Sequence, residues 1–137
     1  MRAVQSISEP GHLCWVDLAT TDVQRAAAFY GRLFGWSTEA QAAGGGRFNT
    51  FYGVDGPVGS MYQLSGAQVA AGVPAHWTMY ISATDVDRTA ETVTRLGGQV
   101  VVPAQSIAGV ARIALIADPA GAIVGLWQSP VGRGGRR

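Results

Sequence analysis

The chain has 137 residues, of which 47% are hydrophobic and 14% are charged, and its formal net charge is +1. This length suits one domain with a sizeable core, and the apolar composition leaves little room for long disordered regions. Every basic residue is an arginine, and without the three in the tail at 133–137 the net charge is −2, so the folded part carries no electrostatic footprint for nucleic acid.

Three further features narrow the class of protein. No stretch reaches the roughly 18 apolar residues that a membrane helix needs, and the first ten residues lack the apolar segment of a secretory signal. The single cysteine, Cys14, excludes an intramolecular disulfide and a CxxC metal or redox motif. We therefore expect a cytoplasmic protein that binds neither nucleic acid nor a membrane.

The first half of the chain reads as strand, helix and three strands. Alternation of apolar and polar residues predicts a strand over His12–Ala19. A helix is predicted to begin at Thr21, with Gln24 placed for a capping box, and to end at Gly35. Its buried stripe is predicted to be Val23, Ala27, Tyr30 and Leu33 or Phe34. The strands that follow are predicted over Trp36–Ala40, Arg47–Val54 and Gly59–Ser65.

The second half follows the same plan after a linker, rich in glycine and alanine, over Gly66–Ala75. A strand is predicted over Trp77–Ala83 and a helix over Asp85–Leu96. The buried stripe of this helix is predicted to be Val86, Ala90, Val93 and Leu96. Three strands are again predicted, over Gln99–Pro103, Val110–Ala117 and Ala122–Gln128.

The two halves also repeat one another in sequence. Residues 19–35 return 63 positions later as residues 82–98, with eight identical positions. Such a repeat indicates two copies of one supersecondary unit. We predict an α+β domain of two βαβββ modules, residues 11–65 and 76–129, with tails at 1–10 and 130–137. A ferredoxin-like fold would leave one strand unaccounted for in each half.

Three segments carry a resemblance to a known family, and with the repeat they cover nearly the whole chain: Trp15–Trp36, Asp85–Gly98 and Asp118–Trp127. In these segments the chain resembles the vicinal oxygen chelate superfamily, which includes glyoxalase I, extradiol dioxygenases and bleomycin-resistance proteins. The resemblance implies paired βαβββ modules that form a curved mixed sheet around a cavity. It also implies a homodimer, because many members are homodimers.

The resemblance implies where metal ligands would stand, since metal-dependent members take them from the first and last strand of each module. Carried over by spacing, these positions are Trp15, Tyr62, Thr78 and Gly125. The family pattern puts His or Glu there, whereas these side chains offer at most one phenolate and a weak neutral oxygen. We therefore predict no metal and no cofactor. A two-residue displacement of the register would be needed to bring His76 into the position of Thr78 as a ligand.

Residues on the same strand faces are predicted to line the cavity. The predicted ligand-binding residues are Trp15, Asn49, Phe51, Tyr62, Thr78, Tyr80 and Trp127. Gly125 is predicted to leave space beside them. Aromatic walls with a few polar groups suit a flat or partly aromatic small molecule. On the third strand of the second module, Ile113, Leu115 and Ala117 are predicted to face the helices instead.

Two charged residues interrupt apolar strands, Asp17 in the first half and Arg112 in the second. A charge in such a place is costly unless it is paired or solvated. Asp17 is a candidate general base and Arg112 a candidate oxyanion stabiliser. For both, a structural salt bridge or a surface position is an equal alternative.

Three functions fit these residues. The first is a metal-free protein that binds and sequesters an aromatic antibiotic or metabolite, as in the bleomycin-resistance branch. The second is a metal-independent lyase, isomerase or cyclase that uses the same cavity. The third is a glyoxalase or dioxygenase that keeps a divalent metal despite the substitutions.

Overall fold

The computed structural model describes residues 9–43 and 46–130, which form an α+β fold of eight strands and three helices. The chain divides into two compact units. We call Val16–Thr78 the Asp17 unit, and Met1–Trp15 together with Met79–Arg137 the Trp127 unit. The predicted tails, including the arginine-rich segment at 133–137, lie mostly outside the described residues.

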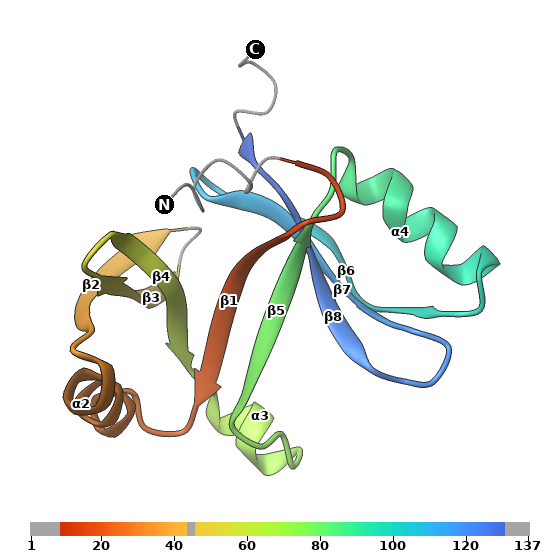
Figure 1. Ribbon diagram of the computed structural model, residues 1–137. Coiled ribbons are helices and arrows are strands. Elements are labelled where there is room, and N and C mark those ends of the chain that lie inside the picture. Colours follow the sequence, from red (N-terminus) through yellow and green to blue (C-terminus); the bar gives the residue numbers. More distant parts are fainter. Residues whose placement is uncertain (1–8, 44–45, 131–137) are drawn as a thin grey trace. The chain divides into compact units, whose positions relative to one another are not determined.

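The Asp17 unit contains most of the first module (Figure 1). Its elements are β1 (Leu13–Thr20) from Val16 on, α2 (Val23–Phe34), β2 (Ser37–Ala43), β3 (Gly46–Gly53), β4 (Gly56–Gln63) and α3 (Gly66–Ala70). The strands lie in the order β2-β3-β4-β1, with β1 parallel to β4 and the other neighbours antiparallel. The strand and helix order is the predicted one, except that α3 occupies the start of the predicted linker.

The Trp127 unit repeats this topology. Its elements are β5 (His76–Ser82) from Met79 on, α4 (Val86–Arg95), β6 (Gln99–Ile107), β7 (Ala111–Ala117) and β8 (Ile123–Gln128). The order is β5-β8-β7-β6, with β5 parallel to β8 and the other neighbours antiparallel. Three strands follow the module's helix in both halves, which confirms the prediction of two βαβββ modules.

Each unit has its own core beneath its helix. In the Asp17 unit, Leu18, Phe51 and Met61 are buried, with Tyr30 of α2 and Trp36 packed against them. In the Trp127 unit, the buried residues are Val86 of α4, Ala114 and Leu126. Both faces that carry these residues are therefore covered by helices, and a candidate site has to be sought on the opposite face of each set of strands.

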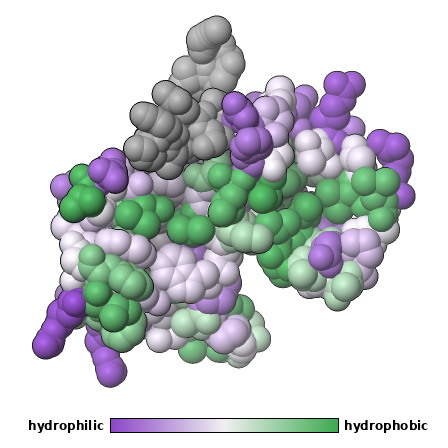
Figure 2. Space-filling model, in the orientation of Figure 1, coloured by the Kyte–Doolittle hydropathy of each residue, from purple (hydrophilic) through white to green (hydrophobic). Residues whose placement is uncertain are grey.

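The predicted capping box of Thr21 and Gln24 is wrong, because α2 begins one residue later, after Asp22. Asp22 and Asp85 are the N-caps of α2 and α4, and each side chain accepts a hydrogen bond from the backbone N–H three residues on. The predicted buried stripes fail at their last positions, since Leu33, Phe34 and Leu96 are exposed. Figure 2 shows the resulting hydrophobic surface over α2.

The predicted facing of the third strand of each module is wrong. Asn49 pairs with Met61 across β3 and β4, and Phe51 is fully buried against Tyr30 and Trp36. Both were expected to line a cavity, but both stand on the helix-covered face. The ladder between β3 and β4 shifts register beyond Phe51. Because β3 carries apolar residues on both faces, the alternation of its residues could not show which face meets the helix.

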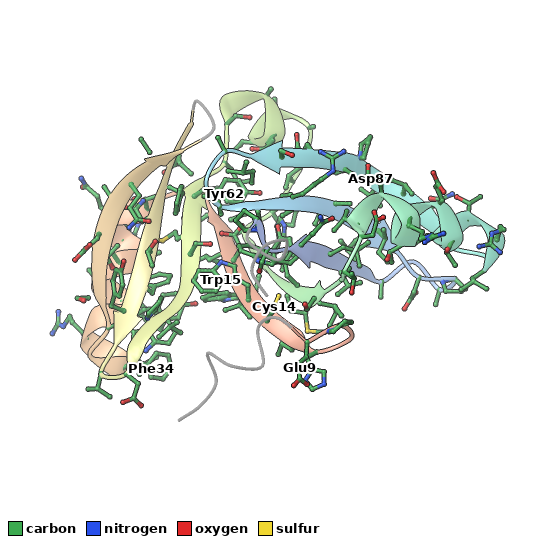
Figure 3. The ribbon with its side chains drawn as sticks, turned by 90° about the horizontal axis from the view of Figure 1, so that it is seen from above. Glu9, Cys14, Trp15, Phe34, Tyr62 and Asp87 are labelled. Carbon is green, nitrogen blue, oxygen red and sulfur yellow. The ribbon has the colours of Figure 1, made fainter. Side chains whose placement is uncertain are left out.

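In the second module, Arg112 likewise lies on the helix side of its strand and not on the face predicted to line the cavity. Its guanidinium donates to both carboxylate oxygens of Asp87 on α4, with Nε 2.7 Å from Oδ2, and also to Ser106. Figure 3 shows Asp87 on this helix. It is Ala114 that packs against Val86 of α4, with Ile116 beside them, rather than Ile113 and Leu115. The charge of Arg112 is thus neutralised by a surface salt bridge on the helix side.

Candidate functional site

On the face of the Trp127 unit away from α4, three aromatic side chains gather. The rings of Trp15 and Trp127 have centroids 5.7 Å apart, and those of Tyr80 and Trp127 are 5.6 Å apart and nearly perpendicular. Tyr80 is buried, while both indoles are partly exposed. Such tilted and edge-to-face contacts are favourable between aromatic rings. We call Trp15, Tyr80 and Trp127 the ring cluster.

Gly125 is part of the reason the ring cluster forms. It pairs with Tyr80 across β5 and β8, and a Cβ built on Gly125 would overlap the Tyr80 ring. The expectation that Gly125 leaves open space is therefore wrong, because the Tyr80 ring fills that place. A side chain of any size at residue 125 would displace the ring.

The corresponding face of the Asp17 unit is polar. Asp17 on β1 pairs with Ser60 on β4, and the Ser60 hydroxyl donates to Asp17 Oδ1 at 2.7 Å. Thr50 on β3 continues the row, because it pairs with Ser60 from the other side. The Thr50 hydroxyl donates to the side-chain oxygen of Gln41 on β2. We call Asp17 and Ser60 the acid–hydroxyl pair.

Burial raises the pKa of Asp17 from 3.8 to about 6, although the Ser60 hydrogen bond and the electrostatic interaction with His76 act in the opposite direction. The pKa of the Tyr62 phenol is also raised, by burial and by the nearby negative charge of Asp17. A carboxyl that titrates close to neutrality can act as an acid or as a base. Asp17 is the one predicted site residue that has this property.

The register of the last strands differs from the predicted one. Tyr62 pairs with Ala19, and Trp127 pairs with Ser82, the counterpart of Ala19 in the repeat. Tyr62 therefore corresponds to Trp127, and Ser60 corresponds to Gly125. The offset between the modules has grown from 63 to 65 residues, so Tyr62 and Gly125, which a constant offset of 63 makes counterparts, do not correspond.

This correction gives the four positions where the resemblance implies metal ligands as Trp15, Ser60, Thr78 and Gly125. They supply an indole N–H, two hydroxyls and no side chain, which is not a donor set for a divalent ion. Within residues 9–43 and 46–130, no three His, Cys, Asp or Glu side chains gather closely enough to hold a metal. The residues present therefore do not fit the metal of the metal-dependent relatives.

The histidines take local partners. Nδ1 of His76 lies 2.8 Å from the carbonyl oxygen of Pro74, and His12 faces Glu9 at 3.3 Å on the surface. Thr78 is buried two residues further along β5 from His76. Sequence reasoning missed Ser60. The sequence feature that could have identified Ser60 is the similarity of Met61-Tyr62-Gln63 to Leu126-Trp127-Gln128, which gives an offset of 65 between the last strands.

These features agree with a family assignment that rests on sequence. Residues 11–126 match the Glyoxalase/Bleomycin resistance protein/Dioxygenase superfamily, and the chain belongs to this superfamily.

Two curated relatives are similar over most of the chain. "Putative glyoxylase CFP32" of Mycobacterium tuberculosis is 42% identical over 125 residues, which cover 84% of this chain and 44% of the relative. The anthracycline biosynthesis protein DnrV of Streptomyces peucetius is 34% identical over 138 residues, covering 91% of this chain and 50% of the relative. The chain thus spans about half the length of these relatives.

Solved structures share the fold at low sequence identity. A variant of Streptomyces coelicolor methylmalonyl-CoA epimerase, in complex with 2-nitronate-propionyl-CoA, has a TM-score of 0.63 and 16% identity over 89% of this chain and 96% of its own. The hypothetical protein BH1468 from Bacillus halodurans has a TM-score of 0.63 and 13% identity, over 87% and 94%. In the described part of this chain, no helix has the length and apolarity that a membrane span requires.

Proposed function

We propose that this chain is a small-molecule-binding protein whose ring cluster takes a planar aromatic ligand. The observation that carries the proposal is the gathering of Trp15, Tyr80 and Trp127 on the strand face opposite to α4. Two partly exposed indoles offer large, rigid apolar surfaces at low entropic cost. The similarity to an anthracycline biosynthesis protein supports a ligand of this class, because anthracyclines contain a planar quinone ring system.

Titration with an anthracycline and with 1-methoxypyrene, a neutral planar compound, tests the proposal. We expect both to quench tryptophan fluorescence at micromolar concentration. Trp127→Ala should weaken binding roughly tenfold, because it removes one ring face and the edge contact with Tyr80. Phe29→Ala, which removes an exposed ring on α2, is the control and should bind as the wild type does. Absence of binding by both compounds would end the proposal.

We also propose that binding needs no divalent metal, as in the bleomycin-resistance branch, and that the ligand is sequestered unchanged. The donor set at Trp15, Ser60, Thr78 and Gly125 supports this. Elemental analysis of protein purified without chelator should find no stoichiometric divalent ion, and EDTA should leave the dissociation constants unchanged. A stoichiometric ion whose removal abolishes binding would restore the glyoxalase or dioxygenase alternative.

A second candidate function is a metal-independent lyase, isomerase or cyclase with Asp17 as its acid or base. The acid–hydroxyl pair favours it, since Ser60 orients a carboxyl whose pKa is about 6. Arg112 has no part in this candidate, because it is paired with Asp87 on the helix side. Product analysis after incubation with a bound compound decides between the two. Turnover that is lost in Asp17→Asn while binding remains would establish the enzyme.

We further propose a cytoplasmic homodimer. Two copies would match the curated relatives in length, and Cys14 is a buried thiol whose pKa is raised to about 11 by burial, which suits a reducing compartment. One chain has a mass of 14.3 kDa, and sedimentation equilibrium should give twice this mass. A monomer at micromolar concentration would contradict the dimer without affecting the ligand proposal.

A further inference from the structure

The ring cluster continues into an apolar strip on the same strand face of the Trp127 unit. Leu115 on β7 pairs with Gly125 on one side and with Val102 of β6 on the other. One step along β7, Ile113 pairs with Trp127. Because paired residues of neighbouring strands point to the same face of a sheet, these three aliphatic side chains lie beside the rings. We call Val102, Ile113 and Leu115 the aliphatic strip.

The aliphatic strip lies on the side of the strands opposite to α4. Ala114, between two of its members, packs against Val86 of α4, so its neighbours on β7 point the other way. All three side chains of the strip are partly exposed. The row from Tyr80 to Val102 crosses the adjacent strands β5, β8, β7 and β6. At about 4.8 Å for each strand spacing, this row is roughly 14 Å long.

In the described part of this unit, the charged side chains stand away from the rings and the strip. α4 and its N-cap carry most of them, and Arg112 is turned toward Asp87 of α4. Asp118 accepts from backbone N–H groups of the turn before β8, and Glu9 faces His12 ahead of β1. A charged group of a ligand on this face would therefore lose water and find no opposite charge among the described residues of the unit.

We propose that the aliphatic strip extends the ligand site of the ring cluster and selects an uncharged polycyclic ring system. This inference rests on the proposed function and names the charge and the extent of its ligand. A flat molecule laid along the row removes water from the rings and from the aliphatic side chains at once, and its affinity grows with the apolar area that it covers. An ionised group on the same ring system opposes this gain, because it has to leave water without a partner.

The test compares three pyrenes that differ in one group, by fluorescence titration of the full chain at pH 7.5. They are 1-methoxypyrene, which is neutral, 1-pyrenecarboxylate, which is an anion, and 1-pyrenemethylammonium, which is a cation. The wild type should bind the neutral compound roughly tenfold more tightly than either ion, since each ion loses hydration on this face.

Val102→Lys puts a cation at the far end of the strip, on a strand at the edge of the sheet. This variant should lose the preference for 1-methoxypyrene over 1-pyrenecarboxylate and should bind the ammonium compound still more weakly. Val100→Lys is the matched control, because Val100 lies on the same strand but pairs with Ile116 on the α4 side. The control should keep the preference of the wild type. Circular dichroism checks that both variants are folded.

Equal or tighter binding of either ion by the wild type, with 1-methoxypyrene still bound, would overturn the selection against charge and leave the proposed function standing. Tighter binding of the ammonium compound alone would instead show that the indoles recognise a cation. Equal preferences in Val100→Lys and Val102→Lys would place the ligand away from the strip. A change in the sedimentation mass of Val102→Lys, with its ligand preference unchanged, would show that a second copy covers the strip. Failure of the wild type to bind any planar compound would overturn both proposals.

Discussion

At the scale of single residues, Asp17 links the candidate site to the stability of the fold. Its pKa is raised from 3.8 to about 6 because burial disfavours the charged form. In the unfolded chain the carboxyl returns to its ordinary pKa. Between about pH 4 and pH 6 the folded protein therefore holds more protons than the unfolded chain, and the free energy of unfolding falls as the pH rises through this window.

Asp17→Asn removes that ionisation while Asn can still accept from Ser60. We expect the variant to match the wild type near pH 3.5 and to be more stable at pH 7.5, by about 2–3 kcal/mol at most. Urea unfolding at the two pH values measures this. A variant that is less stable at pH 7.5 would show that the ionised carboxylate stabilises the fold, contrary to the cause given for its pKa.

Gly125 and Tyr80 give a second prediction at this scale. Gly125→Ala should destabilise the fold by roughly 1–3 kcal/mol, because the new methyl group overlaps the Tyr80 ring. In a Tyr80→Ala background the same substitution should cost much less, so a double-mutant cycle should give a coupling above about 1 kcal/mol. Additive effects in urea unfolding would mean that Gly125 is needed for another reason.

At the scale of elements, both modules fasten the start of their helix in the same way. Asp22 and Asp85 cap α2 and α4, and a glutamine at the end of the last strand accepts from the first helical N–H. Gln63 accepts from Val23 at 3.2 Å, and Gln128 accepts from Val86 at 2.9 Å. Each helix is thus held to its strands at one end by side chains.

Asp85→Ala should destabilise the fold by about 1 kcal/mol, because the Arg88 N–H loses its partner. Asp85→Ser should cost only a few tenths of a kcal/mol, since serine is also a good N-cap. Urea unfolding of the two variants at pH 7 makes the comparison. Equal losses in both would show that the charge of Asp85, rather than its capping oxygen, is what matters.

The elements also show what the sequence could predict. Helix and strand order followed from periodicity and from the repeat. The first cap did not, because the expected capping box of Thr21 and Gln24 is replaced by Asp22 as the N-cap. Helix α3 was visible as well, since Ser65 and Gln68 form a capping box at the start of the assumed linker. Facing was harder. Strand β7 is apolar on both sides, so its alternation could not decide whether Arg112 or Ile113 faces the helix.

The candidate site was predictable only in part, for the same reason. The odd-numbered positions of β1 and β8 predicted the strand face of Trp15, Asp17 and Trp127, the face away from the helices, because an aromatic or charged residue there marks it. Ser60 was hidden by the change of offset from 63 to 65. This change is already present in β3 and β7, since Thr50 pairs with Ser60 and Leu115 pairs with Gly125. It follows the register shifts between β6 and β7, which the ladder between β2 and β3 lacks. Such a change of offset is seen only when the last strands of the two modules are aligned with each other separately from the rest of the repeat.

At the scale of the whole molecule, the compact units and the repeated modules do not coincide. The Trp127 unit includes the start of β1, and the Asp17 unit includes the start of β5. Trp15 of the first module therefore contacts the ring of Trp127 of the second. Likewise, Trp77 of the second module donates to the Tyr30 hydroxyl of the first and contacts its ring.

A break in the chain between residues 70 and 71 should therefore leave two fragments that depend on each other. The fragment that ends at residue 70 lacks Trp77, and the other lacks Trp15, so each loses an aromatic contact of its own core or ring cluster. We expect neither fragment alone to show cooperative thermal unfolding by circular dichroism, and an equimolar mixture to recover it. If either fragment unfolds cooperatively alone, its module is an independent folding unit. The contacts that Trp15 and Trp77 make with residues of the other module are then dispensable for stability.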